Sequence, residues 1–474
     1  MDRRRFLRTT AVAASAAAAA SRPQRALAAR DRPNILFCIA DDLSWAHTSA
    51  MGDPVVRTPA FDRVAEEGVL FTHCFCSAPS CTPSRGAILT GRNFWELDEG
   101  ALLWSTLSTR FAVYPDLLAR AGHFIGVTRK GWGPGDAKIG GWGRNPAGPG
   151  FKGFAEFLQA RPERQPFCFW FGSQDPHRPY EAGSGLASGK RIEDVRLPPF
   201  LPDAPEVRSD ILDYYVEVER YDRGIGEMLA LLEARRELDN TLVLITSDNG
   251  MPFPRAKTNL YDFGTRMPLA VRWPERVPAG RRVTDFISHI DLAPTFLEAC
   301  GIAPPEVMSG RSFLSVLTST RDGRVDPDRD AAFTGRERHV RHSDGGGYPC
   351  RAIRTDQYLH IWNLKPERWP AGEPDGYGDV DGGPTKAYML GRPNDESVAH
   401  YFELGFGRRP EEELYDLRSD PNQLTNVADR PQYAAARQSL RARLEDRMRS
   451  TGDRRLTGGA EMWESLPYYG RQGG

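Results

Sequence analysis

Short runs of apolar residues recur up to about residue 246, and each run is followed by polar or charged side chains. The runs span residues 35–40, 124–128, 167–171 and 242–246. They are apolar throughout rather than alternating, and helical patterns such as 214–235 lie between them, so they predict parallel strands buried on both faces. The sequence therefore predicts an α/β fold with a large, mostly parallel sheet between helices.

The polar residues that follow these runs predict one functional edge of the sheet. In open α/β sheets, ligands bind beyond the carboxyl ends of the strands. We therefore expect the side chains that follow the strands to meet in one site. These side chains are Asp41, Asp42, Lys130, His177, Asp248 and Asn249.

The second half of the chain has a different pattern. Residues 322–347 are rich in Arg, Asp and Gly, so we expect a long loop there. Residues 351–362 resemble a pair of strands, and residues 432–450 have the spacing of a charged terminal helix. We predict a catalytic domain over residues 31–340 and a smaller α+β subdomain over residues 347–474.

The first 28 residues are typical of an export signal. A twin-arginine start at Arg3 and Arg4 precedes an Ala-rich run and an A-x-A site that ends at Ala28. The Ala-rich run is too short for a convincing membrane span. This pattern predicts passage through the Tat translocase to a periplasmic or secreted location.

Charge and cysteine usage exclude several classes of protein. The formal net charge is −1, so the basic field typical of nucleic-acid binders is missing, and we expect no nucleic-acid partner. Seven cysteines without paired C-x-x-C spacing predict neither a disulfide framework nor a zinc site. Any specificity for anions must therefore come from local residues.

Cys81 is the one cysteine whose neighbours indicate chemistry. It precedes Pro83, which suits the first turn of a helix, so position 81 faces a helix N-terminus, where backbone N–H groups favour anions. Arg85 adds a fixed positive charge. The residues alone indicate a nucleophile beside an anion site, with an ordinary buried cysteine as the alternative.

The C-x-P-S-R segment that begins at Cys81, followed by L-T-G-R ending at Arg92, resembles the signature of the formylglycine-dependent sulfatases. The paired aspartates after the first strand, S-D-N-G from Ser247 and E-L-Y-D-L from Glu413 extend the resemblance over the mature chain. It implies an alkaline-phosphatase-like sulfatase fold. It also implies that a formylglycine-generating enzyme converts Cys81 to formylglycine (3-oxoalanine).

Four oxygen-bearing side chains from two strand ends are candidate metal ligands. Hard oxygen donors suit Ca²⁺ or Mg²⁺ and not zinc, although acidic pairs in loops are also typical of helix caps and solvated turns. The resemblance favours a metal site, implies Ca²⁺ and leaves Mg²⁺ as the alternative. The implied ligands are Asp41, Asp42, Asp248 and Asn249.

The resemblance also implies a mechanism. A hydroxyl of the hydrated aldehyde at position 81 attacks sulfur, the sugar amine or alcohol leaves, and loss of the second hydroxyl proton ejects sulfate. Arg85 and Lys130 would stabilise the nucleophile and its anionic oxygens. His177 and Lys257 would contact the sulfate, and one of them would protonate the leaving group. Taken alone, His177 is equally typical of a structural histidine, and Lys257 is more typical of a surface charge.

Closer similarity points to the heparan N-sulfatase (sulfamidase) branch. D-P-H-R from Asp175 and T-N-L-Y from Thr258 carry it, and it implies a sulfated carbohydrate substrate, N-sulfoglucosamine of heparan-type glycans. Two positions depart from the pattern: Lys257 replaces an arginine, and Trp132 stands where many sulfatases have histidine. Four residues are candidate substrate contacts, with packing or solvated loops as the alternative: Trp132, Arg178, His339 and His342.

Three other functions stay open at this point. An O-sulfatase acting on another glycan or an aryl sulfate needs only different pocket loops. A phosphonate or phosphodiester hydrolase is possible because phosphoryl and sulfuryl centres have similar shapes. A non-catalytic binder of sulfated glycans is the third, and the retained Cys81, Arg85 and Lys130 argue against it.

Overall fold

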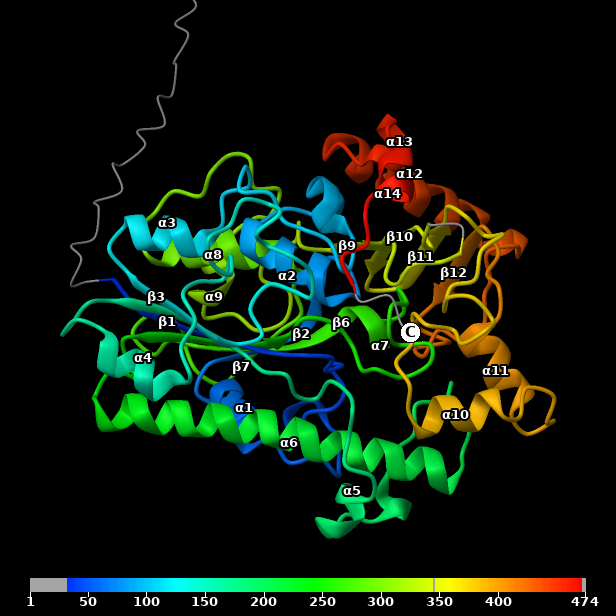
Figure 1. Cartoon of the computed structure of the whole chain (residues 1–474), viewed down its shortest axis with the longest axis horizontal. Helices are drawn as coiled ribbons and strands as arrows, with labels where there is room; N and C mark the ends of the chain where they lie inside the picture. The colour runs from blue at the N-terminus through cyan, green and yellow to red at the C-terminus, as the bar shows by residue number, and fades with distance from the viewer. Residues whose placement is uncertain (1–31, 344–345, 471–474) are drawn as a thin grey trace, which may run out of the picture.

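The computed structural model describes residues 32–343 and 346–470, so the export signal predicted over residues 1–28 lies outside the described residues. Two layers of helices enclose a large central sheet, and a smaller sheet lies beside it (Figure 1). Within the described ranges, no helix combines the length and the apolar character that crossing a bilayer requires.

The central sheet has the strand order β3-β4-β1-β5-β6-β2-β7, and β8 pairs with β2. β1 pairs in parallel with β4 and β5, and β3 pairs in parallel with β4, whereas β6 runs antiparallel to both of its neighbours. The predicted mostly parallel sheet is therefore confirmed. Its strands are β1 (Asn34–Ala40), β2 (Val69–Phe75), β3 (Phe124–Arg129), β4 (Phe167–Gly172), β5 (Thr241–Ser247), β6 (Arg266–Arg272), β7 (Arg281–Val283) and β8 (Ile287–Ser288).

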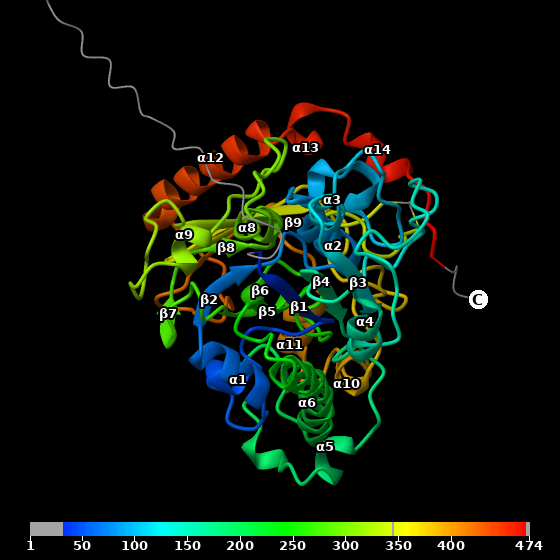
Figure 2. The ribbon, with the colours of Figure 1, turned by 90° about the vertical axis from the view of Figure 1, so that its left-hand side faces the viewer.

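Helices cover both faces of this sheet, which explains why the strands are apolar throughout (Figure 2). Leu36 and Cys38 of β1 face one core with α6, whereas Ile35 and Phe37 face the other core with α8. The first layer contains α1 (Pro59–Glu66), α4 (Phe154–Ala160), α5 (Ser184–Ala187) and α6 (Pro205–Ala234). The second contains α2 (Cys81–Thr90), α3 (Tyr114–Arg120), α8 (Leu292–Ala299) and α9 (Leu314–Leu317).

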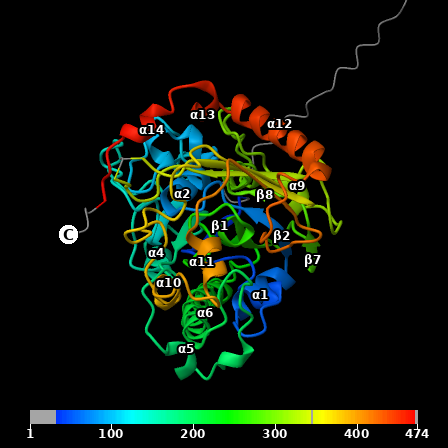
Figure 3. The same ribbon diagram turned by 90° about the vertical axis from the view of Figure 1, so that its right-hand side faces the viewer.

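The smaller sheet is antiparallel, with the order β12-β11-β10-β9, and the terminal helix α12 packs on it (Figure 3). The predicted strand pair and terminal helix are confirmed. Its strands are β9 (Ala331–Arg336), β10 (Cys350–Thr355), β11 (Tyr358–Asn363) and β12 (Glu412–Asp416). The remaining helices are α7 (Asp262–Thr265), α10 (Pro384–Leu390), α11 (Ala399–Phe406), α12 (Ala434–Ser450), α13 (Arg454–Thr457) and α14 (Glu461–Ser465).

The long loop expected over residues 322–347 was wrong in part, because β9 lies inside it. Ala332 and Thr334 are buried where β9 pairs with β10, and Phe333 packs against the core under α12. This short strand is stabilised by the neighbouring strand rather than by its own composition. β9 also belongs to the smaller sheet although it precedes residue 340, and the domain boundary stays a prediction.

Arg351 of β10 joins the smaller sheet to the end of the chain. Its buried guanidinium donates to Asp453, the residue before α13, at 2.5 Å and to Glu337 at 2.7 Å. We expect Arg351→Met to destabilise the protein by about 3–5 kcal/mol, because the buried Asp453 loses its ion-pair partner and the buried Glu337 keeps only Arg455. Urea unfolding of the mature protein measures this change. The exposed Arg418→Met is the control, and equal unfolding midpoints for the two variants would contradict the prediction.

Candidate active site

Cys81 is the first residue of α2, and Ser80 before it is extended with φ −157°. The side chain is buried, and Sγ donates to Asp41 Oδ1 at 3.4 Å. Burial raises the pKa of the Cys81 thiol well above its usual range. Since the thiolate is the nucleophilic form of cysteine, the unmodified side chain is a weak nucleophile here.

The pairing of β1 with β5 brings four predicted metal ligands together. Because these strands are adjacent and parallel, the residues after Ala40 lie beside the residues after Ser247. Ligand atoms of three of them, Asp41, Asp42 and Asp248, lie within 4.8 Å of one another and of Cys81 Sγ, and the fourth, Asn249, donates a hydrogen bond to Asp42. Asp42 has φ +76°, a left-handed conformation that is uncommon outside glycine and marks a sharp turn at the strand end.

The glycine after Asn249 is required by the backbone behind it. A Cβ at Gly250 would lie 1.8 Å from the carbonyl oxygen of Phe263, so no larger residue fits without moving the chain. The Gly250 N–H donates to the Gly264 carbonyl at 2.9 Å. This close approach fixes the turn that holds Asp248 and Asn249 at the sheet edge.

The donor set fits a hard divalent cation. Asn249 Oδ1 is buried and has no hydrogen-bond partner among the described residues, while its Nδ2 donates to Asp42 Oδ1 at 2.6 Å. Burial opposes ionisation of Asp41, but the charges of Lys130 and Arg85 hold its pKa below the usual range. Burial raises the pKa of Asp248 above its usual range, and the charge of Arg85 opposes that shift. Carboxylate oxygens and an unused amide oxygen are the ligands that Ca²⁺ and Mg²⁺ take.

Each acidic ligand has a basic partner. Lys130 Nζ lies 2.7 and 2.6 Å from the two carboxylate oxygens of Asp41. Lys257 Nζ lies 2.5 and 2.6 Å from those of Asp42. Arg85 Nε donates to Asp248 Oδ2 at 2.7 Å, and its other nitrogens donate to backbone carbonyls. The structure therefore places three predicted catalytic cations directly against the predicted metal ligands.

His177 presents one ring nitrogen to this cluster. Its Nδ1 lies 2.6 Å from the carbonyl oxygen of Arg178, which only accepts, so Nδ1 carries a proton. Nε2 lies 3.9 Å from Asp42 Oδ2. The imidazole is thus oriented by the backbone, and Nε2 is the atom that can take up or release a proton at the site.

The candidate substrate contacts have partners of their own. Arg178 forms a two-pronged pair with Asp210 at 2.8 and 2.7 Å, and His342 lies 3.4 Å from Asp379. His339 Nδ1 lies 2.8 Å from Ser80 Oγ, and burial lowers the pKa of His339 to about 3, so it is neutral at pH 7. These three roles stay predictions.

Trp132 is almost entirely buried against α2. It is part of the core cluster on that side of the sheet, and a Cβ on Gly86 would lie 3.6 Å from its indole Nε1. Its backbone N–H donates to Asn145 Oδ1 at 2.9 Å. These contacts are those of a packed side chain, and the role of Trp132 in substrate binding stays a prediction.

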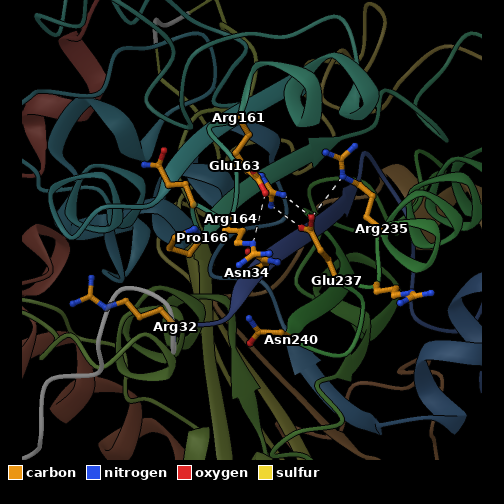
Figure 4. A pocket seen from close by; sticks show the side chains of 11 residues that line it. Arg32, Asn34, Arg161, Glu163, Arg164, Pro166, Arg235, Glu237 and Asn240 are labelled. Carbon is orange, nitrogen blue, oxygen red and sulfur yellow. Dashed lines mark hydrogen bonds and ion pairs between the residues drawn. The ribbon is translucent and has the colours of Figure 1, made fainter.

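A cavity of about 680 Å³ opens on the cluster, and its lining includes Asp41, Lys130, Trp132 and His177. Another cavity, of about 560 Å³, lies near Asn34 at the opposite end of β1 (Figure 4). Its lining is rich in arginine but holds no cysteine, histidine or aspartate. Of these two cavities, only the first is lined by a residue of the acidic cluster, Asp41.

One residue of the site was missed by the sequence analysis. Asp381, in the loop between β11 and α10, has Oδ2 3.4 Å from Lys257 Nζ. A carboxylate oxygen of Asp381 also lies within 4.8 Å of ligand atoms of Asp42 and His177. Its sequence context, D-V-D-G-G, is typical of a solvated turn, so the neighbouring residues do not indicate that Asp381 belongs to the site.

Two family profiles match this chain. The sulfatase family profile matches residues 33–143 and 150–302, and the profile described as N-sulphoglucosamine sulphohydrolase, C-terminal, matches residues 255–369. Human N-sulphoglucosamine sulphohydrolase is 29% identical over 473 residues, which cover 88% of this chain and 90% of that protein. Ulvan-active sulfatase of Formosa agariphila is 26% identical, covering 89% and 76%.

A solved structure of a protein in complex with its substrate D-glucosamine-2-N,6-O-disulfate has the same fold. The TM-score is 0.64 at 20% identity, over 89% of this chain and 98% of that one. The predicted alkaline-phosphatase-like sulfatase fold is confirmed. Because the sulfatase profile matches more than half of the sequence, this chain belongs to the sulfatase family and is a sulfuric ester hydrolase.

Proposed function

We propose that the protein removes the N-sulfate group from N-sulfoglucosamine of heparan-type glycans. The observation that carries this proposal is Cys81, buried at the start of α2 within 4.8 Å of three aspartates. The match of residues 255–369 to the C-terminal profile of N-sulphoglucosamine sulphohydrolase supports the N-sulfated substrate, as does the human relative of that name.

The nucleophile in this proposal is formylglycine made from Cys81 by a formylglycine-generating enzyme. The raised pKa of the thiol supports it, because an unmodified Cys81 would remain protonated. The hydrate of formylglycine supplies a hydroxyl that attacks sulfur. Folding before passage through the Tat translocase would allow this modification in the cytoplasm, ahead of a periplasmic or secreted location.

Asp41, Asp42, Asp248 and Asn249 would hold the divalent cation, with Ca²⁺ as our proposal. When bound there, the cation lowers the pKa of the attacking hydroxyl and polarises the sulfate group. The ammonium groups of Lys130 and Lys257 supply fixed positive charge for the anionic sulfate oxygens.

His177 is the proposed general acid. A new S–O bond forms at position 81 while the S–N bond breaks, and the leaving nitrogen needs a proton. His177 Nε2 faces the cluster, and Nδ1–H is engaged by the Arg178 carbonyl, so the proton delivered comes from Nε2. Arg85 holds Asp248 in place and does not need to contact substrate for this role.

Sulfate release by the mature protein, produced together with a formylglycine-generating enzyme, tests the proposal. The substrates are N-sulfoglucosamine, 6-O-sulfated N-acetylglucosamine and an aryl sulfate, and Cys81→Ala is the blank. We expect the N-sulfated sugar to be cleaved with the highest kcat/KM. Release from the O-sulfated sugar alone would contradict the proposed substrate and leave the mechanism standing.

A second candidate is an O-sulfatase acting on another sulfated glycan. The ulvan-active sulfatase supports it, because this chain covers 76% of that protein at 26% identity. Adding ulvan oligosaccharides to the panel separates the two candidates. A phosphonate monoester in the same panel tests the hydrolysis of phosphoryl centres, and cleavage of that compound alone would overturn both sulfatase proposals.

A further inference from the structure

Asp381 brings a carboxylate to the active site from a part of the chain that supplies none of the predicted catalytic residues. Its loop precedes α10, and its Oδ2 reaches to 3.4 Å from Lys257 Nζ. This oxygen is buried, and although it pairs with Lys257, it accepts no hydrogen bond among the described residues. An unused acceptor carries a free-energy cost, and because the Asp381 side chain is 29% exposed, a donor on a ligand can approach it and recover that cost.

Asp381 is poorly placed to hold a second metal ion. It forms an acidic group with Asp42 and His177, but the Lys257 ammonium contacts both carboxylates, at 2.5 Å from Asp42 and 3.4 Å from Asp381. Asp42 is already a proposed ligand of the first cation, so a second hard cation would gain only one new carboxylate here, fewer oxygen ligands than Ca²⁺ or Mg²⁺ takes. Lys257 already neutralises part of the charge, so Asp381 is better placed to accept from a neutral hydrogen-bond donor than to bind a second cation.

Asp381 also differs from the groups that face sulfate. Burial opposes its ionisation, but the positive charge of Lys257, together with His177 and His339, holds the pKa of Asp381 below its usual range. An ionised carboxylate repels the oxygens of a sulfate group and accepts strongly from O–H and N–H donors. The sugar ring that carries the sulfate presents such donors next to the reacting bond.

We infer that Asp381 recognises the sugar by accepting a hydrogen bond from a hydroxyl or N–H group next to the scissile sulfate. This inference rests on the proposed function, because it requires a sulfated sugar as substrate. Asp42 belongs to the acidic group around Cys81 and also to the group that contains Asp381, which places the acceptor beside the reacting centre. An aryl sulfate offers no hydroxyl there and does not use it.

The test compares Asp381→Ala with Asp375→Ala, which removes an exposed carboxylate from the same loop. We expect Asp381→Ala to lower kcat/KM for the sulfated sugar by about 10–100-fold, the cost of a hydrogen bond to a charged group. The kcat/KM for an aryl sulfate, which reports any change at Lys257, should fall by a clearly smaller factor, and Asp375→Ala should leave both substrates unaffected. Equal losses on the two substrates, or no loss on either, would overturn the inference.

Binding separates this inference from the proposed function. Calorimetry on Cys81→Ala measures the affinity for N-sulfoglucosamine and for the aryl sulfate without turnover, and Asp381→Ala is then added to that protein. We expect the double variant to lose affinity for the sugar alone. A wild-type protein that cleaves no sulfated sugar would refute the proposed function, whereas unchanged or absent sugar binding in this series would refute the role of Asp381.

Discussion

Replacing Cys81 with alanine should lower kcat for sulfate release by at least about a thousandfold, the scale seen when a covalent nucleophile is removed. Alanine offers no side chain that can become an aldehyde, so the nucleophile of the proposed mechanism is lost. The surrounding pairs Lys130–Asp41 and Arg85–Asp248 remain, so the fold should be retained. Cys300→Ala is the matched control, because Cys300 is equally buried and belongs to the core around α8.

The same experiment includes a chemical readout. Mass spectrometry of the peptide that contains position 81 shows whether the cysteine has been oxidised, with and without the formylglycine-generating enzyme. We expect activity to follow the converted fraction, because burial keeps the Cys81 thiol protonated. If unconverted protein is as active as converted protein, the thiol itself is the nucleophile and the proposed chemistry fails.

The sequence could predict the central sheet because its strands follow a simple physical rule. β1 alternates between two cores, so Leu36 and Ile35 must both be apolar, and continuous hydrophobicity indicates a strand covered on both sides. The polar residues gather at one edge of the sheet because parallel strands have their carboxyl ends at the same edge. Asp41 lies near Asp248 because β1 and β5 are adjacent, although their adjacency itself is a tertiary fact that local sequence does not contain.

Other features were beyond prediction because they depend on partners distant in the sequence. β9 forms because β10 pairs with it, and its own Ala- and Gly-containing residues give no strong preference. The pairing of Arg178 with Asp210 could not be predicted either, because Asp210 lies on α6, 32 residues away in the sequence. Asp381 becomes part of the site only when its loop folds over Lys257, and no spacing along the chain encodes that contact.

Asp248→Asn should lower the affinity for the divalent cation by about 100-fold or more, since even residues that only support metal ligands contribute 10–100-fold. The variant keeps the side-chain shape but loses the charge that faces both the cation and Arg85. In the wild type, Oδ1 of Asp248 also accepts hydrogen bonds from the backbone N–H groups of Asp42 and Asn249, at 3.1 and 2.8 Å. One substitution therefore weakens a ligand and the turn that presents two others.

Metal content by elemental analysis and the Ca²⁺-dependent shift in Tm measure this effect without relying on activity. A cation that binds the folded protein at 100 times its Kd stabilises it by about 2.7 kcal/mol, so Ca²⁺ should raise the Tm of the wild type. Asp222→Asn is the control, since Asp222 is a buried carboxylate on α6 that accepts from Ala60 and Phe61 outside the cluster. The shift should persist in Asp222→Asn and largely vanish in Asp248→Asn. Retention of full metal content and the same Tm shift in Asp248→Asn would show that the cation is held elsewhere, and the oxygens of Asp41, Asp42 and Asn249 would then need another explanation for their convergence.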